Sequence, residues 1–249
     1  MPFDIVIGRA KEEIEEYGSL GAVFLGKQYV TMGTVTSLSN NVFLDVTRSH
    51  VVFVCGKRGG GKSYTMGVIA EGIATLQPDI KQNLSIILLD TMGVYWTMKY
   101  PNHEDAALLD EWKLEGQGLS VKIFTPAGFY AMYKEKGIPT DVAFSIKPSD
   151  LQPEDWCLTF GLDQNSPAGV LIARVVQSLG KDFDIVEMKK AAEKDDKSDD
   201  HTKNVVIGRL ERVEGWGIFS KEGTPLKELA RAGQVTVLDM SVYATLPSG

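Results

Sequence analysis

The sequence predicts an α/β fold with a mostly parallel central sheet, preceded by a small β-rich module. Two observations carry this prediction. After residue 48, short apolar runs alternate with helix-compatible stretches, which is typical of α/β proteins. One of these runs leads directly into a glycine-rich loop, and a helix-compatible stretch follows that loop. We therefore expect a β-module over residues 1–48 and a core over residues 49–249.

Composition sets broad limits on the function. A chain of 249 residues with 43% apolar content can fill a sizeable core. The net charge of −7 excludes a surface that is basic all over, as a nucleic-acid coat would require, but it allows a local basic channel. The two cysteines cannot form a disulfide framework. Because the chain also lacks a signal-like start and a long apolar span, we expect a soluble cytoplasmic protein with no membrane partner.

The first 48 residues predict a charged helix and several short strands. The helix is expected over 9–17. Apolar pieces between Gly, Thr, Ser and Asn then predict strands over 22–25, 29–30, 33–36 and 42–46. A segment of this size is marginal as an independent domain, so we expect it to pack on the core that follows.

The central feature of the chain is a strand, a loop and a helix. The run Val51–Cys55 predicts a strand, in which Cys55 is expected to be buried and inert, and a helix is expected over 64–75. Between them, residues 56–63 match the P-loop pattern of Gly, four free positions, Gly, Lys and Ser or Thr. Glycines let the backbone curl around an anion, and the helix dipole favours negative charge there. The predicted nucleotide-binding residues are Gly56, Lys57, Arg58, Gly59, Gly60, Gly61, Lys62 and Ser63.

Two of these side chains have assigned roles in the predicted site. Lys62 is placed to reach the β- and γ-phosphates of ATP and is the candidate catalytic residue. The Ser63 hydroxyl is the candidate ligand of Mg²⁺, with Asp90 as a further candidate. Glu71 lies on the same helix, where a solvent-exposed role is the simpler interpretation.

Four further strands and two helices are expected after the loop. The strands are predicted over 84–90, 120–124, 141–146 and 235–239. The first of them is nearly continuous in apolar residues, which predicts burial on both faces. Ser-Pro and Thr-Pro pairs with later glycines predict helices over 166–180 and 224–233.

Several polar groups have simple structural interpretations. The charged tract 187–203 is expected to be a solvated helix end and loop. Two groups of aromatic and basic residues suit either stacking on nucleic acid or ordinary packing, and packing is the simpler interpretation. They comprise Tyr95, Trp96, Lys99 and Tyr100, and separately Tyr130, Tyr133, Lys134 and Lys136. The three histidines, His50, His103 and His201, have no metal-ligand spacing.

Several stretches together resemble the archaeal HerA family of the FtsK–HerA superfamily of ring-forming ATPase motors. They are Phe24–Lys27, Leu44–Val46, Arg48–Cys55 running into the P-loop, and the turn Asp90–Tyr95. The similarity is densest over 24–100 and is a matter of general layout beyond that point.

The resemblance implies a RecA-like core with a β-barrel-like N-terminal module. It implies a homo-hexamer with ATP and Mg²⁺ between subunits, movement or unwinding of duplex DNA, and cooperation with an end-resecting nuclease in recombinational repair. It also adds Tyr64 as the next backbone contact of the nucleotide.

Two departures from the family pattern bear on catalysis. The turn after the second strand usually reads Asp-Pro-x-Gly-Glu-Tyr, but here Thr91 replaces Pro and Val94 replaces Glu. No apolar strand ends in the Asp-Glu pair that such a motor needs to position Mg²⁺ and the attacking water. We interpret this as a core that is incomplete at its C-terminus, and we expect the chain to bind ATP with little turnover. The arginine that would reach a neighbouring subunit stays open among Arg174, Arg209, Arg212, Arg231 or residues outside this sequence.

Two other classes of function remain open from the residues alone. One is a nucleotide-binding regulatory or scaffold protein without turnover. The other is a related motor whose track is protein, with which the acidic balance is compatible.

Overall fold

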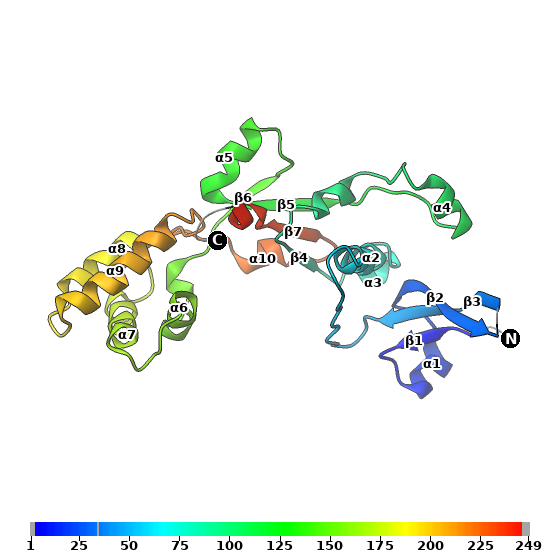
Figure 1. Cartoon of the computed structure of the whole chain (residues 1–249), viewed down its shortest axis with the longest axis horizontal. Coiled ribbons are helices and arrows are strands. Elements are labelled where there is room, and N and C mark those ends of the chain that lie inside the picture. Colours follow the sequence, from blue (N-terminus) through cyan, green and yellow to red (C-terminus); the bar gives the residue numbers. More distant parts are fainter. Residues whose placement is uncertain (1–2, 34, 246–249) are drawn as a thin grey trace. The chain divides into compact units, whose positions relative to one another are not determined.

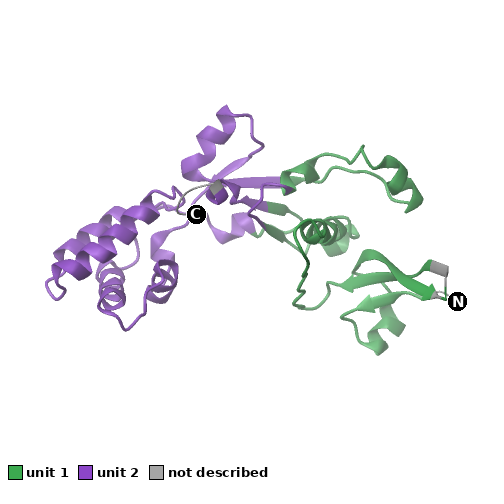
Figure 2. Ribbon diagram, in the orientation of Figure 1, with its two compact units in different colours: residues 1–88, 95–121, 230–236 green, residues 89–94, 122–229, 237–249 purple. Residues whose placement is uncertain are grey.

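The computed structural model describes residues 3–33 and 35–245 and forms two compact units (Figures 1 and 2). Unit 1 comprises residues 1–88, 95–121 and 230–236, and unit 2 comprises residues 89–94, 122–229 and 237–249. The fold is α/β, with one small mixed sheet and one larger parallel sheet, which confirms the predicted P-loop NTPase class with an N-terminal β-module.

The N-terminal sheet of unit 1 has three strands in the order β1-β3-β2. The strands are β1 (Ile5–Ile7), β2 (Ala22–Met32) and β3 (Val35–Asp45), and α1 (Lys11–Tyr17) lies between the first two in sequence. β2 and β3 are antiparallel, and β1 runs parallel to β3. The short pieces expected from the sequence merge into two long strands, because register shifts in the β2–β3 ladder let pairing continue through the polar interruptions.

The remaining helices of unit 1 follow the glycine-rich loop. They are α2 (Lys62–Ala74), α3 (Pro78–Lys81), the 3₁₀-helix η1 (Tyr95–Lys99) and α4 (Ala106–Glu111). α2 packs against β2 and approaches it closely at Gly72, where an added Cβ would lie only 2.1 Å from Val23 Cγ1.

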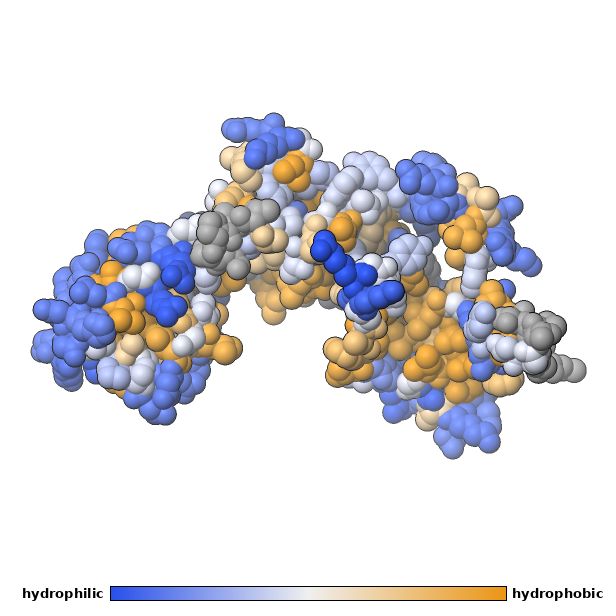
Figure 3. Space-filling model, in the orientation of Figure 1, coloured by the Kyte–Doolittle hydropathy of each residue, from blue (hydrophilic) through white to orange (hydrophobic). Residues whose placement is uncertain are grey.

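The predicted strand at Val51–Cys55 does not form. The described sheets contain no strand from this segment, and most of its apolar side chains are exposed, with Phe53 at 87% and Val54 half-buried. Figure 3 also shows hydrophobic residues over much of the visible face of unit 1. β-branched residues favour an extended backbone, but a strand exists only where a neighbour pairs with it, and this segment has no such neighbour among the described strands. Cys55 is accordingly exposed, so its predicted burial was wrong.

The larger sheet has four strands in the order β4-β7-β5-β6. They are β4 (Ile86–Asp90), β7 (Val235–Asp239), β5 (Val121–Pro126) and β6 (Val142–Phe144), at the four places where strands were predicted. β7 is buried at every position, as a strand between two neighbours should be. β4 instead alternates, with Leu89 65% exposed, so its predicted burial on both faces was wrong. β4 stands at the edge of this sheet, where the strand has a neighbour on one side only.

Unit 2 is mainly helical. Its helices are α5 (Ala127–Glu135), η2 (Pro148–Asp150), α6 (Pro153–Phe160), α7 (Pro167–Leu179), α8 (Ile185–Lys194), α9 (Asp200–Glu214), α10 (Leu226–Leu229) and η3 (Ser241–Thr245). α6 to α9 share one hydrophobic core, in which Trp156, Leu171, Met188 and Leu210 are fully buried. α7 has the predicted bounds, because Ser166 Oγ accepts a hydrogen bond from Gly169 N–H at one end and Gly180 ends the helix at the other.

Two predicted segments of unit 2 differ in detail. The helix expected over 224–233 is only the short α10, because the chain turns early and Gly233 N–H donates to the carbonyl of Leu84. The charged tract 187–203 is more ordered than a solvated loop. Arg174 donates to Asp195 through Nε at 2.9 Å, and Asp199 caps α9 by accepting from Thr202 N–H.

Candidate functional site

The loop at residues 56–63 has the curled backbone that its glycines allow. Gly59 and Gly61 have φ values of 75° and 82°, which L-residues with a Cβ rarely adopt. At Gly60 an added Cβ would lie 3.0 Å from the carbonyl oxygen of Lys57, whose oxygen also accepts from Gly60 N–H. Substitutions would therefore strain the backbone at Gly59 and Gly61 and crowd the Lys57 carbonyl at Gly60.

Lys62 connects the two ends of the loop. Its Nζ donates to the carbonyl oxygens of Gly56 at 2.9 Å and of Lys57 at 2.8 Å. A single ammonium group thus stabilises the start of the loop from the first turn of α2. The Lys62 ammonium has three N–H donors, so a bound phosphate could accept from it in place of, or beside, these carbonyl oxygens.

The N-terminus of α2 lacks a side-chain cap. Among the described residues, no acceptor is paired with the backbone N–H groups of Lys62, Ser63 and Tyr64, and Gly61 occupies the N-cap position. The first intrahelical bond runs from Thr65 N–H to the carbonyl of Gly61. Unpaired donors at the positive end of a helix favour a bound anion. Ser63 and Tyr64 are exposed beside them, so the arrangement fits a nucleotide phosphate.

Tyr95 is a site residue that the sequence analysis did not assign to the site. Its hydroxyl donates to the carbonyl oxygen of Ser63 at 3.0 Å, and its ring is buried beside Gly67 of α2, where an added Cβ would lie 3.9 Å from Tyr95 Cε1. The only sequence signal was its place at the end of the Asp90–Tyr95 turn, since nothing in the chain order shows that this turn reaches α2. Tyr95 therefore steadies the first turn of the helix.

Asp90 is buried and already accepts several hydrogen bonds. Its carboxylate accepts from the backbone N–H groups of Met92, Gly93 and Val94. The structure therefore gives this side chain a role in shaping its own turn, and its assignment to Mg²⁺ stays a prediction. Asp90 lies in unit 2, whereas Ser63 lies in unit 1.

Asp239, at the end of β7, is also buried and engaged. One carboxylate oxygen accepts from the N–H and the hydroxyl of Ser241. Gly93 allows the two turns to meet, because a Cβ there would lie 2.9 Å from Ser241 Oγ. The carboxylates at the ends of β4 and β7 are thus each bonded to the turn that follows their own strand.

The aromatic and basic groups are packed in the ordinary way. Tyr133 is buried, and Lys134 lies over the Tyr130 ring and donates to the carbonyl of Thr140. In the other group Trp96 and Tyr100 form an edge-to-face pair. Packing, the simpler of the two interpretations, is what the structure shows for these contacts.

Other candidate groups contribute little to the site. Partial burial raises the pKa of Glu71, which has no other described link to the loop. Arg174, one of the candidate trans arginines, is bound to Asp195 and Ser198. Within the described residues there is no group of His, Cys, Asp or Glu that could hold a metal ion, and no helix is long and apolar enough to cross a membrane.

The fold and the loop together define the class of the protein. An α/β fold in which a glycine-rich loop with Lys and Ser leads into an uncapped helix is that of a P-loop NTPase. Residues 30–247 match the family described as "Helicase HerA, central domain", and the chain belongs to this family. It is thus a P-loop ATPase-type domain of the FtsK–HerA motors. A comparison with curated proteins gives no match.

Proposed function

We propose that the chain binds ATP with Mg²⁺ on the loop and on the first turn of α2. The residues that would hold the nucleotide are Gly56, Lys57, Arg58, Gly59, Gly60, Gly61, Lys62, Ser63 and Tyr64. Lys62 would donate to the β- and γ-phosphates, and the Ser63 hydroxyl would ligate the metal ion, which neutralises phosphate charge when it is bound. The observation that carries the proposal is the uncapped N-terminus of α2 facing the curled loop.

In the intact protein, we infer that nucleotide turnover drives movement or unwinding of duplex DNA. The family match supports a motor of the FtsK–HerA type. We further propose that the protein assembles as a homo-hexamer in the cytoplasm, and that it acts in recombinational repair with an end-resecting nuclease as partner. ATP bound at the loop would then supply the free energy with which the hexamer moves or unwinds DNA.

A second candidate is nucleotide binding with little turnover by this chain. One observation favours it. The carboxylates at the ends of β4 and β7, Asp90 and Asp239, are buried and accept hydrogen bonds from their own turns, and no strand carries the Asp-Glu pair. A carboxylate held in this way is poorly placed to polarise water. Binding would then hold an assembly together without hydrolysis.

Titration of the chain with a fluorescent ATP analogue and Mg²⁺ tests the binding proposal. We expect saturable binding that Lys62→Ala weakens by about a hundredfold or more, since the change removes a charge-assisted donor to phosphate. Lys81→Ala is the matched control, because it removes a lysine from α3 in the same unit, outside the loop. Equal affinity of Lys62→Ala and the unaltered chain would contradict the proposal.

Steady-state phosphate release from the same samples separates the two candidates. We expect turnover near the background rate. Turnover by the unaltered chain that is abolished by Lys62→Ala would contradict the view that this chain lacks a functioning catalytic carboxylate.

A further inference from the structure

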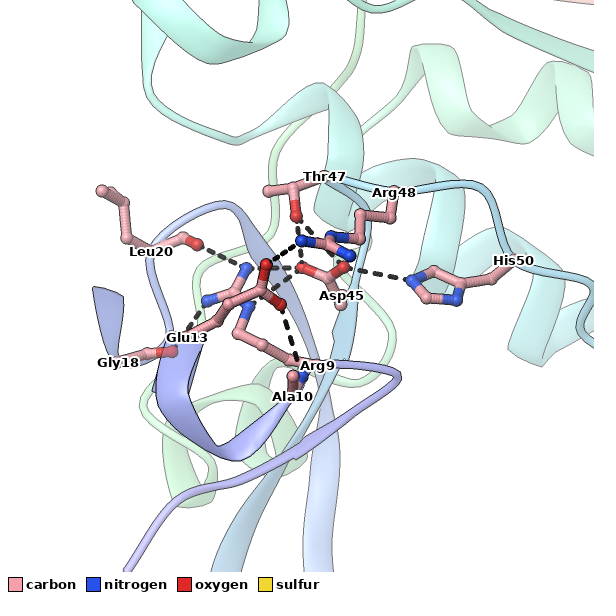
Figure 4. A network of polar contacts seen from close by, with 9 residues as sticks. All are labelled: Arg9, Ala10, Glu13, Gly18, Leu20, Asp45, Thr47, Arg48 and His50. Carbon is pink, nitrogen blue, oxygen red and sulfur yellow. Dashed lines mark hydrogen bonds and ion pairs between the residues drawn. The ribbon is translucent and has the colours of Figure 1, made fainter. Parts of the chain in front are cut away.

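A buried charge network lies directly upstream of the loop, and its centre is Asp45 (Figure 4). Asp45 is the last residue of β3 and only 1% exposed. It accepts from Arg9 Nε at 3.1 Å, from Thr47 Oγ1 at 2.8 Å and, on its other oxygen, it bonds to His50 Nε2 at 3.1 Å. Burial acts to raise the pKa of Asp45, but the hydrogen bonds from His50, Arg9 and Thr47 outweigh it and lower the pKa to about 2. The carboxylate is therefore ionised and fully engaged.

Arg9 ties this carboxylate to the rest of the β-module. Besides Asp45, its guanidinium donates to the carbonyl oxygens of Gly18 at 2.7 Å and Leu20 at 2.8 Å. The guanidinium is almost fully buried. A buried pair of this kind costs much to break, because the remaining charge would be left without a partner.

The position of His50 depends on a glycine as well as on Asp45. Gly8 has a φ of 90°, and an added Cβ there would lie 2.8 Å from His50 Cε1. The imidazole thus occupies space that only glycine at position 8 leaves free. His50 is held from two sides at the end of the linker that leaves β3.

Between His50 and the loop, the described chain has little support. Within the described part of the chain, no hydrogen bond is made by the segment 51–55, and Val51, Val52 and Phe53 are exposed, whereas Val54 is half-buried. The start of the loop is therefore located by His50 on one side and by the Lys62 bonds on the other.

The two ends of the nucleotide loop are anchored to one end of the same ladder. The linker before the loop is held by Asp45, which pairs with Ala22 across the β2–β3 ladder. The helix after the loop is held by Gly72 against Val23, the residue next to Ala22. The β-module thus holds both flanks of the loop at neighbouring positions.

We propose that Asp45 is a positioning residue for the nucleotide-binding loop, which it serves by fixing Thr47 and His50 at the point where the chain enters the segment 51–55. The proposal rests on the proposed function, nucleotide binding at residues 56–64. Asp45 itself does not touch the nucleotide. By holding Thr47 and His50, Asp45 restrains the segment 51–55 that enters the loop. Without this carboxylate the segment becomes more mobile, and ordering the loop around a phosphate costs more conformational entropy.

The test compares nucleotide affinity in variants of the whole chain. We expect Asp45→Asn to weaken binding of the fluorescent ATP analogue by roughly tenfold, equivalent to about 1.4 kcal/mol. Asp4→Asn is the matched control, because Asp4 is an exposed aspartate of the same module that bonds only to Asn41 in the described structure. Hydrogen exchange of the backbone N–H groups over 46–61 should become faster in Asp45→Asn and stay unchanged in Asp4→Asn.

Changes at His50 keep the test decisive if Asp45→Asn fails to fold. His50→Gln retains an N–H donor of similar reach and should restore most of the affinity that His50→Leu loses. Gly8→Ala should act like His50→Leu, because its methyl group would displace the ring from Asp45, although the φ of 90° at position 8 also strains the backbone of this variant. A merely structural network would lower the unfolding temperature in these variants while leaving affinity equal to that of the unaltered chain, and that result would overturn the proposal.

The outcome also separates this proposal from the one on which it rests. If the unaltered chain gives no binding curve, nucleotide binding itself is wrong, and the positioning role falls with it. If the unaltered chain binds and Asp45→Asn binds equally well, only the positioning role is wrong.

Discussion

The two cysteines differ in exposure. Cys55 is exposed in the segment that enters the loop, whereas Cys157 is buried in the core shared by α6 to α9. Burial raises the pKa of Cys157, and the nearby charges of Glu154 and Asp163 raise it further. Because the thiolate is the reactive form, both effects protect Cys157.

Thiol labelling of the folded chain should therefore modify one cysteine. We expect a maleimide at neutral pH to react with Cys55 at least about tenfold faster than with Cys157, as measured by mass spectrometry of peptides. Cys55→Ser should leave almost no fast label, and denaturant should make Cys157 reactive. Slow labelling of Cys55 would mean that the segment 51–55 is covered in solution, contrary to its exposure here.

At the scale of elements, the main contact of the nucleotide-binding helix is its packing on β2. α2 buries few of its own side chains, and Ala70 alone among its described residues is fully buried. The close approach at Gly72 therefore carries much of the contact with Val23. In ordinary helices glycine weakens the element, but here the missing side chain lets helix and strand meet.

This packing predicts coupling between positions 23 and 72. Gly72→Ala should destabilise the chain by about 1–3 kcal/mol, because its methyl group would overlap Val23 Cγ1. Val23→Ala makes room for this methyl group. The double variant should therefore lose less free energy of unfolding than the two single variants lose in sum. Denaturant unfolding of the four proteins measures the coupling.

Gly208→Ala is the control for a helical glycine without a close neighbour. A Cβ there would meet nothing within 4 Å, so we expect a gain of about 0.5–1 kcal/mol. Additive effects of Gly72→Ala and Val23→Ala would show that the cost of the added methyl group does not come from its overlap with Val23.

At the scale of the whole molecule, each of the two compact units carries its own candidate residues. The loop and its anchors in the β-module belong to unit 1, whereas Asp90 and Asp239 belong to unit 2. The net charge of −7 gives no general attraction to nucleic acid. Contact with duplex DNA would need a local basic surface of the assembled protein.

For the intact protein, we expect duplex DNA to stimulate ATP hydrolysis, and salt to weaken the stimulation steeply. Contacts to phosphate release counterions, so an affinity that depends on several of them falls by about 10³-fold or more between roughly 50 and 200 mM salt. Phosphate release at increasing salt, with and without DNA, gives the measurement. A rate of hydrolysis that DNA does not change would favour a motor whose track is protein. Nucleotide binding without hydrolysis would favour the scaffold role.

Much of the architecture followed from the sequence because it depends on local patterns. The glycine spacing predicted the loop, the Ser-Pro pair and Gly180 predicted α7, and short apolar runs predicted four strands of the larger sheet. These features follow from backbone propensity and capping, which act between residues close in the chain. The family resemblance was confirmed over residues 30–247.

Other features depend on contacts between residues that are far apart in the chain, and only the tertiary structure decided them. The apolar segment 51–55 looked like a buried strand, but pairing rather than propensity decides whether a strand forms. The roles of Asp45 and Tyr95 were equally hidden, since Arg9 lies 36 residues from Asp45 and Ser63 lies 32 residues from Tyr95. The sequence by itself determined the chemistry of the loop, and the fold determined what holds that loop in place, because long-range contacts carry no local signal.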